Sequence, residues 1–254
     1  MRNAYEWRRL LLLLSLVVSL DMGGCAGVGA LPFGDPSWKE EVLLHNGSKI
    51  VVERSQSYGG RHEPGQSSPI KEQTVTFTLP NTSTTLEFKS EYGEAIGRAN
   101  FQLISLHIFH GTPYIVTVPN LCPSYIKWGR PNPPYVLFRY DSTAWQRIPL
   151  EELPSEFKDI NLVVNSKGKE KILTAQSVVT AELVKKLNGE LEQPEFKTIL
   201  RMPILDNGIG MTSCPIPSGA TGKLIAPEVD GKLLYYNWWP LAQEWFQRTY
   251  GKGK

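Results

Sequence analysis

Apolar residues gather in four consecutive segments in the middle of the chain. These segments are Phe101–His110, Tyr114–Val118, Tyr135–Tyr140 and Ala144–Pro149. Each is rich in β-branched or aromatic residues and is closed by Gly, Pro, Asn or Asp, which is the usual pattern of a strand and its turn. The first two are apolar at successive positions, which is typical of strands buried on both faces. We therefore expect these two strands to be central in a sheet and not at its edge.

An earlier part of the chain alternates between apolar and polar positions instead. Within Thr74–Leu79, Val75 and Phe77 fall on one face and threonines fall on the other. Leu86 and Phe88 repeat the alternation a few residues later. A period of two predicts antiparallel strands with one buried face and one wet face.

A hairpin is predicted before these strands. Its arms are Val42–His45 and Ser48–Arg54, and Asn46-Gly47 joins them. Asn-Gly is the commonest pair in a type I′ turn, in which both central residues need a positive φ. The next segment, Ser55–Lys71, contains Gly-Gly and Pro-Gly pairs without apolar periodicity, so we expect a long exposed loop.

Two four-strand blocks, at about 41–89 and 101–149, thus follow one another. They predict a mainly β fold of antiparallel meanders that is sandwich-like; the alternative is a pair of propeller-like blades, but a full propeller needs about four or more blades and the chain is too short for it. We expect the β core to span 39–150 and a smaller mixed α/β part, 151–254, to pack on it. In that part Leu150–Pro154 and Asn161–Val164 are predicted as extended. Apolar residues recurring every four positions predict a helix over Thr174–Leu191, with Thr174 as its cap.

The beginning of the chain has the pattern of a secretory signal. Met1–Arg9 is basic, and Leu10–Leu20 consists only of Leu, Val and Ser. This run is shorter than the roughly 20 residues that a membrane-spanning helix needs, and it matches the apolar region of a signal peptide. We therefore interpret residues 1–24 as a signal peptide and the protein as exported.

The residues after this run are more specific. Met22-Gly23-Gly24-Cys25 resembles the lipobox of bacterial lipoproteins, although Met22 replaces the usual Leu. The resemblance implies that Cys25 carries the lipid, palmitate included, and that 25–38 is a tether. Because Ala26 follows the Cys where Asp would indicate retention in the inner membrane, it implies anchoring in the outer membrane, on the periplasmic face. The alternative is ordinary cleavage near Gly24 or Ala26, which would give a soluble periplasmic protein. The mature domain resembles uncharacterised proteobacterial envelope proteins in general character only.

Composition and charge limit the partners. The chain is 41% hydrophobic and 20% charged, which excludes a disordered protein. Without residues 1–24 it loses three of 27 basic and two of 25 acidic residues, which leaves 24 and 23. A nearly neutral protein without a Lys/Arg block is not expected to bind nucleic acid, and its contact with the membrane is expected through the anchor alone.

The chain has three cysteines, of which one is the candidate for lipidation and two remain to form a pair. If Cys25 is lipidated, Cys122 and Cys214 remain as an even pair in an oxidising compartment, which predicts a disulfide between them. The alternative is two unrelated buried thiols.

Motifs for catalysis are missing from the sequence. His107 and His110 lie three apart in a predicted strand, so they face opposite sides and do not chelate one metal, and no cofactor is expected. Ser218–Lys223 lacks the first Gly and the Ser/Thr of a phosphate loop, and no Gly-x-Ser-x-Gly occurs. A non-enzymatic binding or structural role is therefore favoured. The alternative is a periplasmic hydrolase with a dispersed site, in which His62, His107 or His110 would converge on Asp/Glu and Ser.

Aromatic clusters are the remaining candidates for binding. The residues in question are Trp128, Tyr135, Trp238 and Trp239. Exposed aromatic side chains could bind a glycan or another envelope protein. The alternative, which we favour, is that they pack within the core and the loops.

Overall fold

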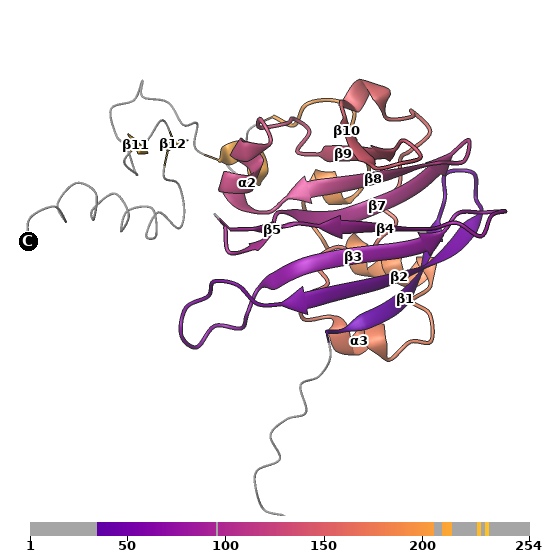
Figure 1. Ribbon diagram of the computed structural model, residues 1–254, viewed down its shortest axis with the longest axis horizontal. Coiled ribbons are helices and arrows are strands. Elements are labelled where there is room, and N and C mark those ends of the chain that lie inside the picture. The colour runs from indigo at the N-terminus through magenta and orange to yellow at the C-terminus, as the bar shows by residue number, and fades with distance from the viewer. Residues whose placement is uncertain (1–34, 95, 206–209, 215–227, 230–231, 234–254) are drawn as a thin grey trace, which may run out of the picture. The chain divides into compact units, whose positions relative to one another are not determined.

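The computed structural model describes residues 35–94, 96–205, 210–214, 228–229 and 232–233 (Figure 1). The predicted signal peptide, Cys25, Trp238 and Trp239 lie outside these residues. None of the described helices is both long and apolar enough to cross a membrane.

The first sheet is an antiparallel meander of four strands. Its strands are β1 (Ser37–Leu43), β2 (Lys49–Tyr58), β3 (Ile70–Thr78) and β4 (Thr85–Ser90), hydrogen-bonded in that order. Val75, Phe77, Leu86 and Phe88 are buried, and the residues between them face outward. The alternation predicted one buried and one wet face, and this prediction is confirmed. The predicted loop after β2 is shorter than expected, because β2 and β3 extend into both of its ends.

The second sheet is also a four-stranded antiparallel meander. It consists of β7 (Phe101–Phe109), β8 (Thr112–Pro119), β9 (Val136–Tyr140) and β10 (Trp145–Ile148), in the order β10-β9-β8-β7. The predicted central position is correct for β8 and wrong for β7, which is outermost. Side chains take the place of a neighbouring strand along β7: the amide of Leu103 donates to Oε1 of Gln73 at 3.2 Å, and that of Leu106 donates to Oδ1 of Asn161 at 2.9 Å. These bonds cover the edge of β7, and its side chains are buried along both faces.

The two sheets share one core, as expected of a sandwich-like fold. Buried side chains of both sheets form a single cluster, which includes Val42, Val52, Val75, Phe77, Leu86, Phe88, Leu103, Leu106, Ile108 and Ile115. The opposite face of the second sheet packs on segments that follow it in the chain, through Leu153, Phe157, Ile160 and Ile199. The fold is thus mainly β, with the later residues packed against it.

A β-bulge at Ile104 decides which way β7 turns its side chains. Leu103 pairs with Thr117 and Ser105 pairs with Val116, which leaves Ile104 as the extra residue. The bulge reverses the alternation, so Leu103 and Leu106 both enter the core between the sheets. His107 is turned to the other face, where its ring stacks on Phe157.

The turn between β1 and β2 differs from the predicted type. Gly47 alone has a positive φ, of 82°, whereas a type I′ turn would need one at Asn46 as well. The amide of Leu44 donates to the carbonyl of Ser48, and the amide of Gly47 donates to the carbonyl of Leu44. This is the pattern of a three-residue hairpin loop with glycine in the left-handed position. The hairpin is confirmed, but the type I′ turn is wrong.

The principal helix is shorter than predicted. α4 (Ala181–Gly189) begins after Thr180, whose hydroxyl accepts from the amide of Leu183 at 3.3 Å, so Thr174 is not its cap. Val179 is extended, because its amide donates to Lys39 and its carbonyl accepts from Glu41, each at 2.8 Å. Pairing with β1 therefore overrides the helical period at this point.

The remaining elements are short. They are β5 (Tyr92–Gly93), β6 (Arg98–Ala99), α2 (Leu121–Lys127), η1 (Leu150–Glu152), α3 (Glu170–Thr174), η2 (Pro194–Phe196), η3 (Met211–Ser213), β11 (Glu228–Val229) and β12 (Lys232–Leu233). The extended conformation predicted for Leu150–Pro154 is wrong, since η1 is a 3₁₀ turn that begins after Pro149.

Two side chains join the outermost strands of one sheet to those of the other. Nδ2 of Asn161 donates to the carbonyl of Leu43 in β1 and to that of Leu106 in β7, at 2.9 and 2.8 Å. Nε1 of Trp145 in β10 donates to the carbonyl of Glu87 in β4 at 2.7 Å. We name these contacts the Asn161 link and the Trp145 link.

Candidate functional site

A hollow with polar walls lies where loops from both sheets meet, and we name it the polar cleft. Its volume is about 660 Å³. It is lined by His62, Gln66, Ser67, Pro69, Ile70, Gln73, Arg98, Gln102, Asn120, Asn165 and Lys167. Figure 1 shows the loop between β2 and β3 projecting from the end of the first sheet where β5 also lies.

The lining residues share a chemical character. Arg98 and Lys167 supply positive charge, His62 supplies an imidazole, and five side-chain amides surround them. No aspartate or glutamate is among the lining residues of this cleft. Nε of Arg98 is buried and has no hydrogen-bond partner in the described part of the chain. A donor-rich surface of this kind suits a ligand that offers negatively charged or hydroxyl oxygens.

Two glycines hold one wall of the polar cleft. Gly60 lies so close to Gly97, just before β6, that a Cβ on Gly60 would stand 2.2 Å from the Gly97 carbonyl oxygen. The amide of Arg61 donates to the same oxygen at 3.1 Å. Because only glycine permits this approach, the loop that carries His62 is fixed against the β5–β6 hairpin.

Residues 165–167 form the opposite wall, and a hydrogen bond to β2 holds it in place. Ser166 is fully buried, and its hydroxyl donates to Oε1 of Gln56 in β2 at 2.6 Å. Its neighbours Asn165 and Lys167 both face the cleft, where Oδ1 of Asn165 accepts from Gln102 at 2.7 Å. Nζ of Lys167 reaches across to the carbonyl of Ser67 at 3.2 Å. The two walls are therefore in direct contact.

Glu170 supports this wall as well. Its Oε1 accepts from Nε2 of Gln56 at 3.2 Å and from the amide of Gly168 at 2.9 Å, and the Tyr58 hydroxyl also donates to it. Burial and the bond to Glu170 raise the pKa of Tyr58. Burial alone would raise the pKa of Glu170, but the bonds from Tyr58 and the backbone outweigh it and lower that pKa. Glu170 therefore acts as a charged acceptor that fixes 165–168.

A buried ion pair lies deeper in the first sheet. Nη1 of Arg54 is 3.5 Å from Oε2 of Glu40, and both side chains are essentially inaccessible. Burial raises the pKa of Glu40 in spite of Arg54. Its oxygens accept from the indole of Trp38 at 2.8 Å and from the amide of Val163 at 2.6 Å. These contacts tie β1 to the segment that covers it, and they leave no face for a ligand.

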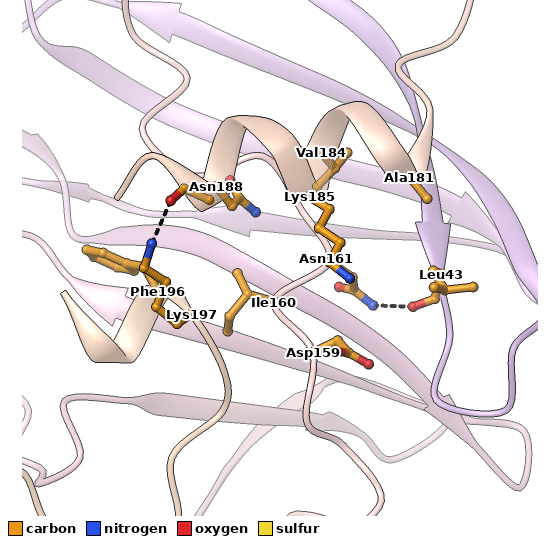
Figure 2. Close-up of a pocket in the computed structure, with 11 residues that line it drawn as sticks. Leu43, Asp159, Ile160, Asn161, Ala181, Val184, Lys185, Asn188, Phe196 and Lys197 are labelled. Carbon is orange, nitrogen blue, oxygen red and sulfur yellow. Dashed lines mark hydrogen bonds between the residues drawn. The ribbon is translucent and has the colours of Figure 1, made fainter. Parts of the chain in front are cut away.

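A second hollow lies beside α4, and we name it the α4 pocket. Its volume is about 300 Å³. Figure 2 shows the lining residues: Leu43, Asp159, Ile160, Asn161, Ala181, Val184, Lys185, Asn188, Gly189, Phe196 and Lys197. Apolar side chains and three charged ones line this hollow, which distinguishes it from the polar cleft.

Of the aromatic residues singled out in the sequence, Trp128 and Tyr135 are described, and both lie outside the two hollows. Tyr135 is 4% exposed, and its hydroxyl contacts the carbonyls of Glu195 and Thr198 at 3.1 Å, so its ring is not accessible to a partner. Trp128 is half-buried against Phe101, with the guanidinium of Arg147 over its ring at 5.1 Å. The structure does not bring Trp128 and Tyr135 into one binding face.

Within the part of the chain that the structure describes, the histidines do not converge on a carboxylate and a serine. His62 lines the polar cleft, whose lining residues include no acid. His107 is fully buried, and its Nε2 lies 3.1 Å from the backbone carbonyl of Asp159. Burial lowers the pKa of His107 from 6.5 to about 4, so the ring is neutral at pH 7. His110 lies in the turn after β7, with φ 49°.

Cys122 and Cys214 are adjacent in the structure. Their Cα atoms are 5.4 Å apart, within the usual range for a disulfide, and the structure joins the two sulfur atoms. The pair connects the first turn of α2 to the residue that follows η3. The predicted disulfide thus has the geometry it requires.

The described residues do not support a metal site. They contain no cluster of three or more His, Cys, Asp or Glu side chains able to hold a metal ion. Comparison with protein-family models, with curated proteins and with solved structures finds no match for this chain.

Sequence reasoning did not find the polar cleft. Its residues come from positions as far apart as His62 and Lys167, and they share no spacing. The local signals were the Gly59-Gly60 and Pro64-Gly65 pairs, which marked the loop as irregular, and His62, which was considered only as a catalytic candidate.

Proposed function

We propose that this protein is a lipid-anchored envelope protein that binds a hydrophilic, negatively charged ligand in the polar cleft without transforming it. The observation that carries the proposal is the lining of the cleft, in which Arg98 and Lys167 stand among amides without a carboxylate. The volume of about 660 Å³ falls within the usual range for small-molecule sites. An acidic oligosaccharide has the carboxylates and hydroxyls that such a surface can bind, and a glycan is one of the two kinds of partner considered from the sequence.

The rigidity of the cleft also favours binding. The Gly60–Gly97 contact fixes one wall, and the Ser166–Gln56 hydrogen bond fixes the other. A site whose walls are set before the ligand arrives loses less conformational entropy when it binds. No acid–base pair lines this cleft, so binding is a better interpretation than hydrolysis.

Calorimetric titration of the mature protein with trigalacturonate tests the proposal, with uncharged maltotriose as the matched ligand. We expect trigalacturonate to bind, to bind more weakly as salt is added, and to be recovered intact. Arg98→Gln and Lys167→Gln should each weaken binding about tenfold, which corresponds to loss of one charge-assisted contact of about 1.4 kcal/mol.

Lys171→Gln is the control, because Lys171 is exposed on α3 and does not line the cleft. Equal affinity for the two trisaccharides, or variants that bind as the wild type does, would refute the proposal. Recovery of shortened trigalacturonate would favour a hydrolase instead.

The anchor is a separate part of the proposal and rests on residues 1–25 alone. The basic start, the leucine-rich run and Gly23-Gly24-Cys25 support lipidation of Cys25. Radiolabelled palmitate should enter the protein in bacterial cells, and Cys25→Ser should abolish the labelling. Labelling that survives the substitution would contradict the anchor while leaving the polar cleft untouched.

A further inference from the structure

The α4 pocket is bounded by four separate parts of the chain. α4 forms one side, Leu43 at the end of β1 forms another, and residues 159–161 and 196–197 complete it (Figure 2). Its volume of about 300 Å³ is at the lower end of the range for ligand sites, so it suits a compact molecule.

The polar groups in the floor of the pocket are already used. Asn161 is 5% exposed; its Nδ2 donates to Leu43 and Leu106, and its Oδ1 accepts from Leu106 and Ser105. Asn188 is equally buried and bonds to the amide of Val164 and the carbonyl of Leu162. These amides hold the walls in place and leave no strong donor or acceptor for a ligand.

What remains is an apolar surface with charges around it. Ile160 and Val184 are buried in the walls, and Phe196 and the 37% exposed Leu43 complete the apolar part. Contact with these side chains would remove a branched aliphatic group from water, at about 25 cal/mol per Å² of buried apolar area.

The charges select the polar end of the ligand. Lys185 is exposed, and Figure 2 shows its side chain extending from α4 towards Asn161. It forms no ion pair within the described part of the chain. Nζ of Lys197 donates to the carbonyl of Gly189 at 2.6 Å. Two lysines against the single Asp159 leave the pocket positive, which favours an anion.

We propose that the α4 pocket binds a small carboxylate with a branched aliphatic body, whose carboxylate pairs with Lys185 and whose body contacts Leu43, Ile160 and Phe196. The site is independent of the polar cleft and of the function proposed for it. Asp159 opposes Lys185 in charge, so an α-amino acid, which also carries an ammonium group, falls within the same class.

NMR titration of the isotopically labelled mature protein tests this proposal, with 4-methylpentanoate as the probe. We expect amide signals of residues 159–161 and 181–197 to shift with increasing ligand. Acetate, which lacks the aliphatic body, and 3-methylbutylamine, which lacks the carboxylate, should bind at least about tenfold more weakly, since each loses one of the two contacts. L-Leucine binding as tightly as the probe, or more tightly, would also support the carboxylate contact.

Lys185→Gln should weaken the binding of 4-methylpentanoate at least about fivefold. Lys186→Gln is a matched control, because Lys186 is the next residue of α4, is also exposed and does not line the pocket. Unchanged affinity in Lys185→Gln, equal binding of the amine, or shifts confined to the polar cleft would overturn the proposal. Arg98→Gln should leave this binding unchanged, so failure here and failure of the polar cleft are distinguishable.

Discussion

The Asn161 link and the Trp145 link do the same work in different surroundings. Each joins an outermost strand of one sheet to an outermost strand of the other. Asn161 is 5% exposed and makes four hydrogen bonds through one amide. Trp145 is half-buried, and it makes one hydrogen bond and packs edge-on against Phe88 with ring centroids 5.2 Å apart.

The difference shows where a polar contact decides stability. If the indole of Trp145 is lost, water can reach the Glu87 carbonyl, so the net change is small. If the amide of Asn161 is lost, the amide and carbonyl of Leu106 stay buried without partners, and each costs about 1–3 kcal/mol. A contact therefore matters in proportion to what it leaves unsatisfied when it is removed.

The largest effect should come from breaking the buried link. Asn161→Ala should lower the free energy of unfolding by about 4 kcal/mol, because the backbone groups of Leu106 lose their partners and a cavity remains. Urea denaturation of the mature protein measures the change. Asn46→Ala, in the exposed β1–β2 turn, is the control and should cost less than about 1 kcal/mol. A loss below 1 kcal/mol in Asn161→Ala would mean that water replaces the amide and that the comparison fails.

The contribution of the disulfide to the free energy of unfolding can be compared with the contributions of the two links. With a sequence separation of 92, replacing both Cys122 and Cys214 by Ser should cost about 2–4 kcal/mol, chiefly by releasing the unfolded chain. Urea denaturation of the double variant and of the unreduced wild type measures this difference. Thiol counting on unfolded, unreduced Cys25→Ser protein should find no free thiol, whereas two titratable thiols would show that the bridge does not form.

Acid should destabilise the folded protein through His107, which is buried near the Asn161 link. His107 contacts the Asp159 carbonyl next to Asn161, and burial lowers its pKa from 6.5 to about 4. The folded state therefore binds the proton more weakly than the unfolded chain does. The resulting stability is complete above pH 6.5 and is lost as the pH falls towards 4, by up to about 3 kcal/mol.

His107→Gln isolates this effect, because every other titrating group is common to both proteins. The difference in unfolding free energy between pH 7 and pH 4 should shrink by up to about 3 kcal/mol in the variant. Trp145→Phe should retain the pH dependence of the wild type. An unchanged pH dependence in His107→Gln would place the titrating group elsewhere.

The smallest effect should come from the exposed link. Trp145→Phe keeps an aromatic ring against Phe88 and removes only the bond to Glu87, so we expect a loss of about 0.5–1 kcal/mol. Thermal unfolding followed by circular dichroism is sufficient to detect it. A loss as large as that of Asn161→Ala would show that exposure does not separate the two links.

The sequence predicted the strands and their buried faces better than it predicted their neighbours in the sheets. Alternation at Val75 and Phe77 indicated a sheet with one wet face, and the continuous apolar run of β7 correctly indicated burial on both faces. The predicted central position of β7 was wrong, because the side chains of Gln73 and Asn161 bond to its outer edge in place of a further strand. The periodicity of a sequence does not show such contacts. Local patterns describe which faces are buried, but not which group supplies the hydrogen bonds at an edge.

The boundaries of the helices and the position of the candidate site could not be predicted, for a related reason. Val179 fits a helical stripe, yet pairing with β1 keeps it extended. The polar cleft depends on contacts such as Gly60 with Gly97 and Ser166 with Gln56, which join residues distant in sequence. Such contacts follow from how the two sheets meet, and a single sequence does not encode that arrangement in any spacing.

The side-chain amides along β7 have a consequence for self-association. A free edge strand offers its backbone to any other extended chain, which is how many β proteins polymerise. On β7 the amides of Leu103 and Leu106 are already bonded to Gln73 and Asn161, and the carbonyl of Ile104 accepts from the amide of Leu162 at 3.2 Å. An incoming strand would have to displace buried groups of the same molecule. Growth of fibres through this edge is therefore opposed by three separate residues, Gln73, Asn161 and Leu162, so that the loss of any one of them leaves the other two in place.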